Sequence, residues 1–469
     1  MLQGYYTPLF TDVARRLTIT DADVNWLEAL QLLVSALVVP VLARLGDLLG
    51  HRRVLLASLV VTAVASWAVA LAPTFATFLV AWALQGFYVA WLPLNVAIIY
   101  GRARRLAATD PSADVPATTR RATGVIVVAL QAGAIGGALV AGQLGTLLAD
   151  RLTIVLAVPA LLVTAALAVV WRLVPADVPA THDGERDRHP TIDVRGAVVL
   201  SLALLAVTGG LSLVRLDGVT IWVGLLVAVG LALGAIFVRL EQRTAAPLID
   251  IALVRRPTLW PVFLTAGLFG VSVLGAQGPL STFARTDPAV HGHGLGLTSA
   301  TASYLIGAYV LSLLVGAALF SRLSTALTPR LVLIGASALV ATGYLALIGL
   351  HGSAVSVASC MVVAGLGSGA LVAALPAAAA AAAPASSTGM ATGLTNTTKT
   401  VGGSFASSVF ALALAGGASS PAADGVTAAP LSGYVTVWAI CGGTAVLALI
   451  ALLTVPRVAF TSVPADAVA

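Results

Sequence analysis

The stretch LARLGDLLGHRR, residues 42–53, places one carboxylate, two glycines and three arginines between two long apolar runs. Asp47 can cap a helix or pair with an arginine, and Gly50 permits a tight backbone turn. The segment therefore predicts a charged turn between two membrane-spanning helices. A pair formed by Asp47 and an arginine could latch two helical bundles on the cytoplasmic side, and its rupture would accompany opening. An ordinary basic loop between two spans is the alternative interpretation.

Outward from this turn, the chain is a succession of apolar runs. Hydrophobic residues make up 59% of the 469 residues and charged residues only 9%, a ratio that excludes an ordinary soluble domain. A helix of about 19 residues crosses a hydrocarbon core of about 30 Å, and lipid offers backbone groups no other partners. We therefore expect thirteen helical spans, near residues 24–44, 54–72, 78–100, 122–146, 152–174, 196–214, 220–238, 260–282, 299–320, 331–350, 355–378, 388–415 and 434–455.

The placement of the arginines orients these spans. Nineteen arginines fall in one alternating set of loops and five in the other, so the first set, with the carboxyl-terminal tail, is expected to be cytoplasmic. Thirteen spans then put the amino terminus outside. We infer that residues 1–16 are the outer end of a first span whose earlier part is missing; a genuine thirteen-span protein is the alternative. The arginines are spread over short loops, so the net charge of +6 indicates no nucleic-acid partner.

The charged turn has a weak internal copy. Residues 44–55, RLGDLLGHRRVL, and residues 322–333, RLSTALTPRLVL, match at six of twelve positions with an offset of 278. The copy has Thr325 in place of Asp47 and Thr328 in place of Gly50. Such symmetry is typical of membrane transporters built from two related halves. Chance similarity between helix edges rich in arginine and leucine is the alternative.

Two charged residues lie clearly inside the predicted spans, Glu28 and Lys399, the latter being the only lysine of the chain. A charge at membrane depth is costly and usually marks a pathway. Glu28 would lie about 6 Å from the outer face and Lys399 about 16 Å from the cytoplasmic end, so no direct pair is assumed. Glu28 either faces a water-filled vestibule or snorkels. Lys399 either attracts an anionic group or responds to proton movement, or it stabilises a cavity through carbonyl contacts.

Uncharged side chains complete a candidate substrate or proton pathway. Each amide could instead form a hydrogen bond between helices, and Trp91 could be a packing residue rather than an aromatic wall for a lipophilic substrate. We expect no metal site, because His291 and His293 lack a carboxylate or thiolate partner, and no cofactor motif is present. The candidates are Gln85, Trp91, Asn95, Gln131, Gln277, Tyr304 and Asn396.

The charged turn resembles motif A of the major facilitator superfamily, Gly-x-Leu-x-Asp-x-x-Gly-x-Arg-Arg/Lys. Ala43 stands where that motif usually has glycine, and the matching residues are Leu45, Asp47, Gly50, Arg52 and Arg53. The two extra central spans, and the phrase EQRTAAPLIDIALVRRP at residues 241–257, look like the fourteen-span branch of drug:proton antiporters. The resemblance implies that the motif A residues form a cytoplasmic charge network that controls alternating access. It also implies a functional basic residue near Lys399, in an Asn-x-x-basic setting that Asn396 begins.

Two further motifs of that superfamily are matched in part. The segment AWALQGFYVA is similar to motif B, but Trp82 occupies the position of the arginine that the family links to proton transfer. The segment GAIGGALVAG is similar to motif C, the antiporter motif, and keeps Gly133, Gly137 and Gly142. These glycines also fit the small-xxx-small pattern of close helix contacts, which is explanation enough by itself.

The apolar runs predict an all-α membrane protein, and the resemblance implies a major-facilitator-type fold with two pseudo-symmetric six-helix bundles and two inserted central helices. The expected divisions are residues 1–174, 175–258 and 259–469. We expect a monomeric, multi-pass protein of the cell membrane that is not an enzyme and exports small lipophilic or cationic molecules, in exchange for protons. The alternatives are a proton-independent facilitator or metabolite exporter, and a membrane scaffold or sensor without transport activity.

Overall fold

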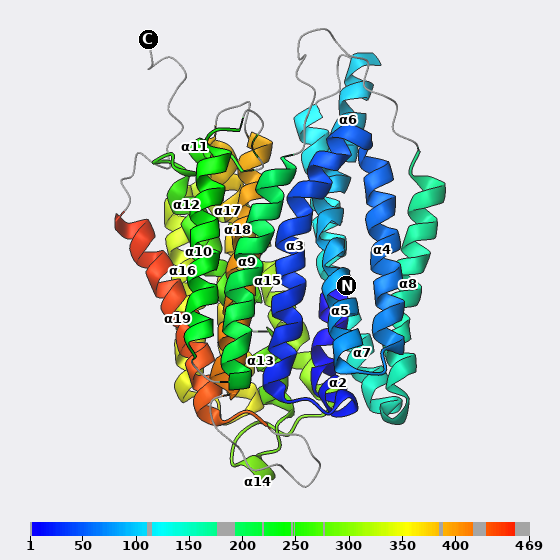
Figure 1. Ribbon diagram of the computed structural model, residues 1–469, viewed down its shortest axis with the longest axis vertical. Coiled ribbons are helices and arrows are strands. Elements are labelled where there is room, and N and C mark those ends of the chain that lie inside the picture. The colour runs from blue at the N-terminus through cyan, green and yellow to red at the C-terminus, as the bar shows by residue number, and fades with distance from the viewer. Residues whose placement is uncertain are drawn as a thin grey trace.

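The computed structural model describes residues 2–109, 115–175, 193–217, 220–244, 247, 249–274, 277–383, 388–415 and 428–454. Within these ranges the regular structure is helical, with no strand, and the long helices run side by side in one bundle (Figure 1). Lipid enforces this outcome, since a helix satisfies its backbone groups within its own segment. The predicted all-α fold is confirmed.

The amino-terminal group of helices forms one side of the bundle (Figure 1). Its first segments, α1 to α2, carry aromatic side chains such as Tyr5, Tyr6 and Phe10 that are at most 2% exposed. The expectation that residues 1–16 are the outer end of an incomplete first span stays a prediction. The elements are α1 Leu2–Tyr6, η1 Thr7–Leu9, α2 Phe10–Leu17, α3 Asp21–Leu49, α4 His51–Leu71, α5 Phe75–Gln85, η2 Gly86–Ala90, α6 Trp91–Thr109, α7 Val115–Leu147, η3 Ala149–Arg151 and α8 Leu152–Leu173.

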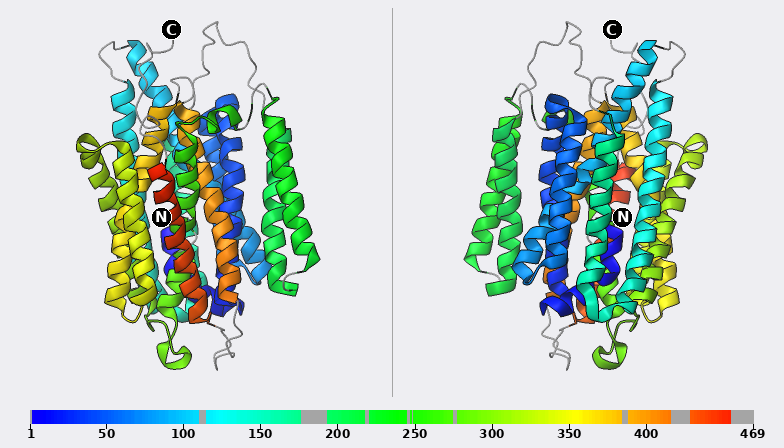
Figure 2. Two further views of the ribbon diagram at one scale, coloured as in Figure 1. Left: turned by 90° about the vertical axis from the view of Figure 1, so that its left-hand side faces the viewer. Right: turned by 90° about the vertical axis from the view of Figure 1, so that its right-hand side faces the viewer.

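The carboxyl-terminal group forms the other side, and an inserted helix pair stands beside both. Figure 2 shows this pair, α9 Val194–Asp217 and α10 Ile221–Glu241, at one flank of the bundle, where α9 contacts α3 and α18. The remaining elements are α11 Ile251–Val254, α12 Trp260–Leu274, α13 Gln277–Arg285, α14 Pro288–His291, α15 Ser299–Ala326, α16 Pro329–Gly349, α17 Ala354–Ala382, α18 Thr388–Ala415 and α19 Leu431–Thr454.

Local sequence sets several helix ends. Thr20 and Asp23 form a capping box at the start of α3, with the Thr20 backbone N–H donating to Asp23 Oδ2 over 2.8 Å. At its other end, Gly50 has a φ of 96°, a conformation that side chains with a Cβ rarely adopt, and its N–H bonds the Gly46 carbonyl. The next helix, α4, starts directly at His51.

Eleven helical segments of the described residues are long and apolar enough to cross a membrane. They correspond to eleven of the thirteen predicted windows. The other two windows, 196–214 and 388–415, form the helices α9 and α18. The polar run that precedes Lys399 makes α18 less apolar than its neighbours.

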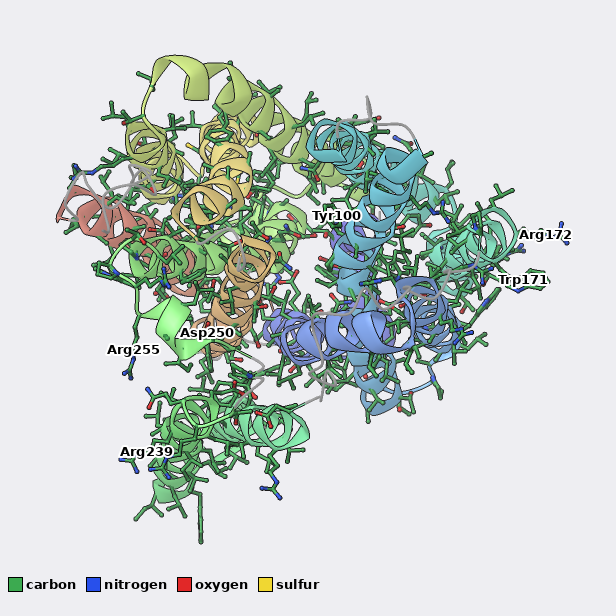
Figure 3. The ribbon with its side chains drawn as sticks, turned by 90° about the horizontal axis from the view of Figure 1, so that it is seen from above. Tyr100, Trp171, Arg172, Arg239, Asp250 and Arg255 are labelled. Carbon is green, nitrogen blue, oxygen red and sulfur yellow. The ribbon has the colours of Figure 1, made fainter. Side chains whose placement is uncertain are left out.

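The end of the bundle that is uppermost in Figure 1, where α3 ends, α4 begins and α8 and α10 end, is called here the arginine-rich end. Seen from that end in Figure 3, Arg172, Arg239 and Arg255 lie at the periphery. The end formed by α2, the start of α3 and α14 is called here the opposite end, and Arg285 lies towards it on α13.

The internal repeat reappears as a pair of equivalent contacts. Arg52 donates from Nε to the Val174 carbonyl over 2.5 Å, and Arg330 donates from Nε to the Leu452 carbonyl over 2.9 Å. Both the donors and the acceptors are separated by 278 residues, the offset of the sequence repeat (330 − 52 and 452 − 174). In each half, an arginine at the start of the second helix of the repeat thus binds the end of a later helix. The sequence match between residues 44–55 and 322–333 therefore reflects related halves.

Candidate functional site

The charged turn between α3 and α4 fastens helices within the amino-terminal group. Besides the Val174 bond, Arg52 donates from Nη2 to the Trp171 carbonyl over 2.7 Å, so its guanidinium caps the end of α8. Arg53 is exposed, and Leu45 packs against the apolar cluster of α3, α4 and α6. The side chain of Asp47 lies outside the part of the chain that the structure describes.

A polar stripe runs along the buried face of α3. Asn25, Glu28, Gln31 and Ser35 are all at most 5% exposed, and their spacing of three or four residues places them on one side of the helix. Ser35 donates to the Gly86 carbonyl over 3.0 Å, which ties the stripe to η2. Of the predicted pathway residues on this helix, Glu28 therefore points into the protein rather than into lipid.

Glu28 lies against the start of α13. A Cβ atom built on Gly278 would be 3.1 Å from Glu28 Oε2 and 3.3 Å from Asn25 Oδ1, so the absence of a side chain there lets the carboxyl group approach the helix backbone. Both carboxyl oxygens of Glu28 are buried, no side chain among the described residues bonds them, and the backbone of Gly278 is the polar group that interacts with them. Gln277, the neighbour of Gly278, bonds its amide to the Val273 carbonyl of α12 over 3.3 Å.

Lys399 lies on α18, a helix of the carboxyl-terminal group that packs against α3. Ser404 of α18 donates to the Ala29 carbonyl of α3 over 2.9 Å, which sets the relative height of the two helices. Counting along the helices, Lys399 stands about 9 Å nearer the arginine-rich end than Glu28. The two charges therefore share one helix pair without forming an ion pair. Both Lys399 and Asn396 are half-buried.

Helix α18 is held tightly against α12 at the level of Lys399. A Cβ atom on Gly270 would overlap the backbone carbonyl of Lys399, and one on Gly402 would overlap the carbonyl of Gly267. Close approach through glycine is the usual means by which membrane helices pack. The height of Lys399 in the bundle is thus set by backbone contacts rather than by its own side chain.

Most of the uncharged pathway candidates form hydrogen bonds within or between helices. Gln85 is fully buried and donates to Tyr6 Oη over 3.1 Å and to Ser66 Oγ over 3.0 Å, so its amide joins helices of one group. Trp91 donates to Ser58 Oγ over 3.2 Å, and Asn95 donates to the Trp91 carbonyl over 2.7 Å. Gln131 is half-buried on α7, and Tyr304 accepts a 2.8 Å hydrogen bond from Gln143 across the α7–α15 contact.

Trp82, at the position of the motif B arginine, is the centre of an aromatic cluster. It is 2% exposed, and its ring lies 4.8 Å from Tyr6, 5.8 Å from Phe10 and 5.7 Å from Phe78, measured between ring centroids. A charged arginine would have to be desolvated in such surroundings. At the position of the motif B arginine, this chain therefore has an aromatic side chain packed among other apolar rings.

The motif C helix, α7, supplies a second contact between the two groups. A Cβ atom on Gly142 would lie 2.7 Å from the Ser299 carbonyl oxygen and would overlap the Ser303 side chain, so glycine lets α7 touch α15. Gly145, which sequence reasoning did not single out, approaches Ser299 and Leu9 in the same way. Gly133 is half-buried and Gly137 buried on the same helix.

A charged cluster missed by sequence reasoning joins the groups towards the opposite end. Arg285 of α13 makes a bidentate ion pair with Asp12 of α2, at 2.7 and 2.9 Å, and also donates to the Pro8 carbonyl. Ser299 of α15 donates to Asp12 over 2.9 Å. Asp12 and Arg285 are 273 residues apart, so no local pattern in the sequence indicates their pairing.

A cavity of about 280 Å³ lies between α3, α5, α9 and α18. Its walls are mostly apolar and include Trp26, Phe75, Leu205 and Ser408. It contains none of the pathway residues predicted from the sequence. It is instead bounded by the inserted helix α9, which closes its outer flank.

Comparison with known proteins identifies this architecture. The Major Facilitator Superfamily profile matches residues 1–407. An uncharacterized MFS-type transporter of Mycobacterium tuberculosis is 32% identical over 262 residues, which are 55% of this chain and 35% of that protein. The multidrug efflux pump LfrA of Mycolicibacterium smegmatis is 32% identical over 230 residues, 49% of this chain and 42% of that pump. The matched region thus spans well under two thirds of the length of either relative.

Solved structures agree with the family profile at the level of the fold. A mutant of the nucleoside transporter NupG superposes with a TM-score of 0.65 at 13% identity, covering 97% of this chain and 96% of that one. An auto-inhibited peptide transporter of the POT family superposes with a TM-score of 0.63 at 15% identity, covering 96% and 93%. With its profile matched over most of its length and its helices arranged as in these structures, the chain belongs to the Major Facilitator Superfamily.

Proposed function

We propose that the protein exports small lipophilic or cationic molecules across the cell membrane by alternating access, in exchange for protons. The observation that carries this proposal is the placement of Glu28 and Lys399 on α3 and α18, two helices that pack across the two groups. Charges at membrane depth on the faces that must separate are expected of a pathway that opens between two halves. The similarity to the efflux pump LfrA supports an exported, rather than imported, substrate.

The test is flux in proteoliposomes that contain the purified chain, with ethidium as the lipophilic cation. An inside-acid pH gradient should drive ethidium into the vesicles, because each proton that leaves draws the substrate inward, and a proton ionophore should abolish the accumulation. Protein-free vesicles are the control. Absence of any protein-dependent flux, with or without a gradient, would contradict transport and favour a scaffold or sensor.

The gating role of the charged turn has its own test. Asp47→Asn should leave membrane insertion and yield unchanged and lower ethidium turnover by about tenfold, since the carboxylate is expected to hold the cytoplasmic charge network. Turnover is measured in vesicles with equal amounts of inserted protein. A variant that works as fast as the natural protein would remove the motif A acid from the mechanism.

A proton-independent facilitator is the second candidate, and Trp82 favours it. An aromatic cluster occupies the place where the family has an arginine linked to proton transfer. In that case ethidium would equilibrate through the protein at the same rate with and without a pH gradient. The same proteoliposome measurement therefore separates the two candidates.

A further inference from the structure

Glu28 is a carboxyl group in the span Ala22–Val39 with no positively charged partner among the described residues. It is 3% exposed, and among the described residues its polar contact is with the Gly278 backbone rather than with any side chain. The described ion pair that joins the two groups, Asp12 with Arg285, leaves Glu28 out. Burying a carboxylate without an opposite charge costs several kcal/mol, and a bound proton or cation removes this cost.

None of the ionisable groups on the surrounding described elements brings a positive charge next to the Glu28 carboxylate. Tyr88 of η2 interacts with Glu28 electrostatically but carries no positive charge. Lys399 stands about 9 Å away in depth, and Arg285 is about 10 Å further along α13 than Gly278 and is paired with Asp12. His293 and His351 contact Phe283 on the far side of α13. The other charged residues of the elements packed against α3 lie towards helix ends: Arg15 and Arg16 of α2, Asp21, Asp23, Arg44 and Asp47 of α3, His51, Arg52 and Arg53 of α4, Arg102, Arg104 and Arg105 of α6, and Arg195, Arg215 and Asp217 of α9.

Helix α13 belongs to the carboxyl-terminal group in sequence, yet it is fastened to the amino-terminal group along its length. Gly278 at its start abuts Glu28, Ser281 in its middle donates to the Thr7 carbonyl over 2.5 Å, and Arg285 at its end holds Asp12. These contacts keep the two groups together on the side of the opposite end. Any opening at that end must undock α13 from α1 to α3.

We propose that Glu28 is the site that binds and releases the coupling proton, and that the proton controls the docking of α13 onto the amino-terminal group. This inference rests on the proposed proton exchange. A proton from water bonds to one carboxylate oxygen while the opposite end is open, and the neutral acid is then buried beneath Gly278 as α13 docks. Loss of that proton towards the arginine-rich end restores a carboxylate, whose burial disfavours the docked state and so drives α13 apart again.

The first experiment reads the proton directly and needs no transport. Infrared spectra of the purified protein at neutral pH should contain a protonated-carboxyl band that Glu28→Gln removes and that sodium does not displace at constant pH. Glu241→Gln, which alters a carboxyl group that is 2% exposed on α10, should leave this band unchanged. Loss of the band on adding sodium would assign a sodium site instead. Absence of any difference between the natural protein and Glu28→Gln would overturn the proposal.

The second experiment separates this inference from the proposed function. In proteoliposomes, Glu28→Gln should lower accumulation driven by a pH gradient by about tenfold or more, and should lower ethidium exchange at equal pH much less. Equal losses in both assays would contradict a coupling role. If the natural protein moves no ethidium, the proposed function fails, and the infrared result still decides whether Glu28 holds a proton.

Discussion

At the scale of the residue, Lys399 brings a positive charge to the helix pair that joins the two halves. A cationic substrate about 10 Å away would be repelled by roughly 1–2 kcal/mol at an effective dielectric constant near 20. Lys399→Met should therefore lower the KM for ethidium about fivefold to thirtyfold and change the KM for a neutral lipophilic substrate by less than about twofold. Kinetics in proteoliposomes provide the measurement, with Lys399→Arg as the charge-preserving control. Equal KM values for ethidium in all three proteins would reduce Lys399 to a structural role.

The two arginines related by the internal repeat are expected to contribute similarly to stability. Each donates two hydrogen bonds to the carbonyl end of a helix, Arg52 to α8 and Arg330 to α19. Arg52→Ala and Arg330→Ala should each lower the free energy of unfolding by about 1–3 kcal/mol, because hydrogen bonds from charged donors are lost. Thermal unfolding in detergent measures this. The exposed neighbour Arg53, changed to alanine, is the matched control, and an equal fall in its midpoint would refute the assignment.

At the scale of the element, the contact between α7 and α15 depends on the small size of Gly142. Gly142→Val should force the two helices apart, because its side chain would meet the Ser299 carbonyl and the Ser303 side chain. We expect ethidium turnover to fall about tenfold or more, since the closed form at the opposite end is strained. Gly136→Val is the control on the same helix, since no atom lies within 4 Å of a Cβ atom built there. Similar losses in both variants would show that helix propensity, and not the interface, is responsible.

At the scale of the whole molecule, the arginine-rich end should face the cytoplasm. Single cysteines at the exposed positions Arg53 and Val290 lie at opposite ends of the bundle. A membrane-impermeant maleimide added to intact cells should modify Val290→Cys, and Arg53→Cys should react only after the cells are opened. The two natural cysteines, Cys360 and Cys441, are buried and should remain unmodified. Labelling of both positions from the same side would overturn the topology.

The sequence anticipated features that depend on neighbours along the chain. Apolar runs predicted the helices, and the 278-residue offset predicted the repeat that Arg52 and Arg330 display as equivalent hydrogen bonds. The sequence was less informative about which side chains from different helices contact each other. From the sequence, Gln85 is a pathway candidate or a helix–helix contact, and only the tertiary structure shows that its amide bonds Tyr6 and Ser66. The gating role of Asp47 stays a prediction.

By itself, the sequence determined that this chain crosses the membrane as helices in two related halves. Lipid makes each span satisfy its own backbone, so length, hydropathy and loop charge are readable one segment at a time. Only the tertiary structure decided that Asp12 meets Arg285 and that Glu28 lies beneath Gly278. Those contacts join residues from different helices, and their formation depends on how whole helices pack rather than on any local pattern.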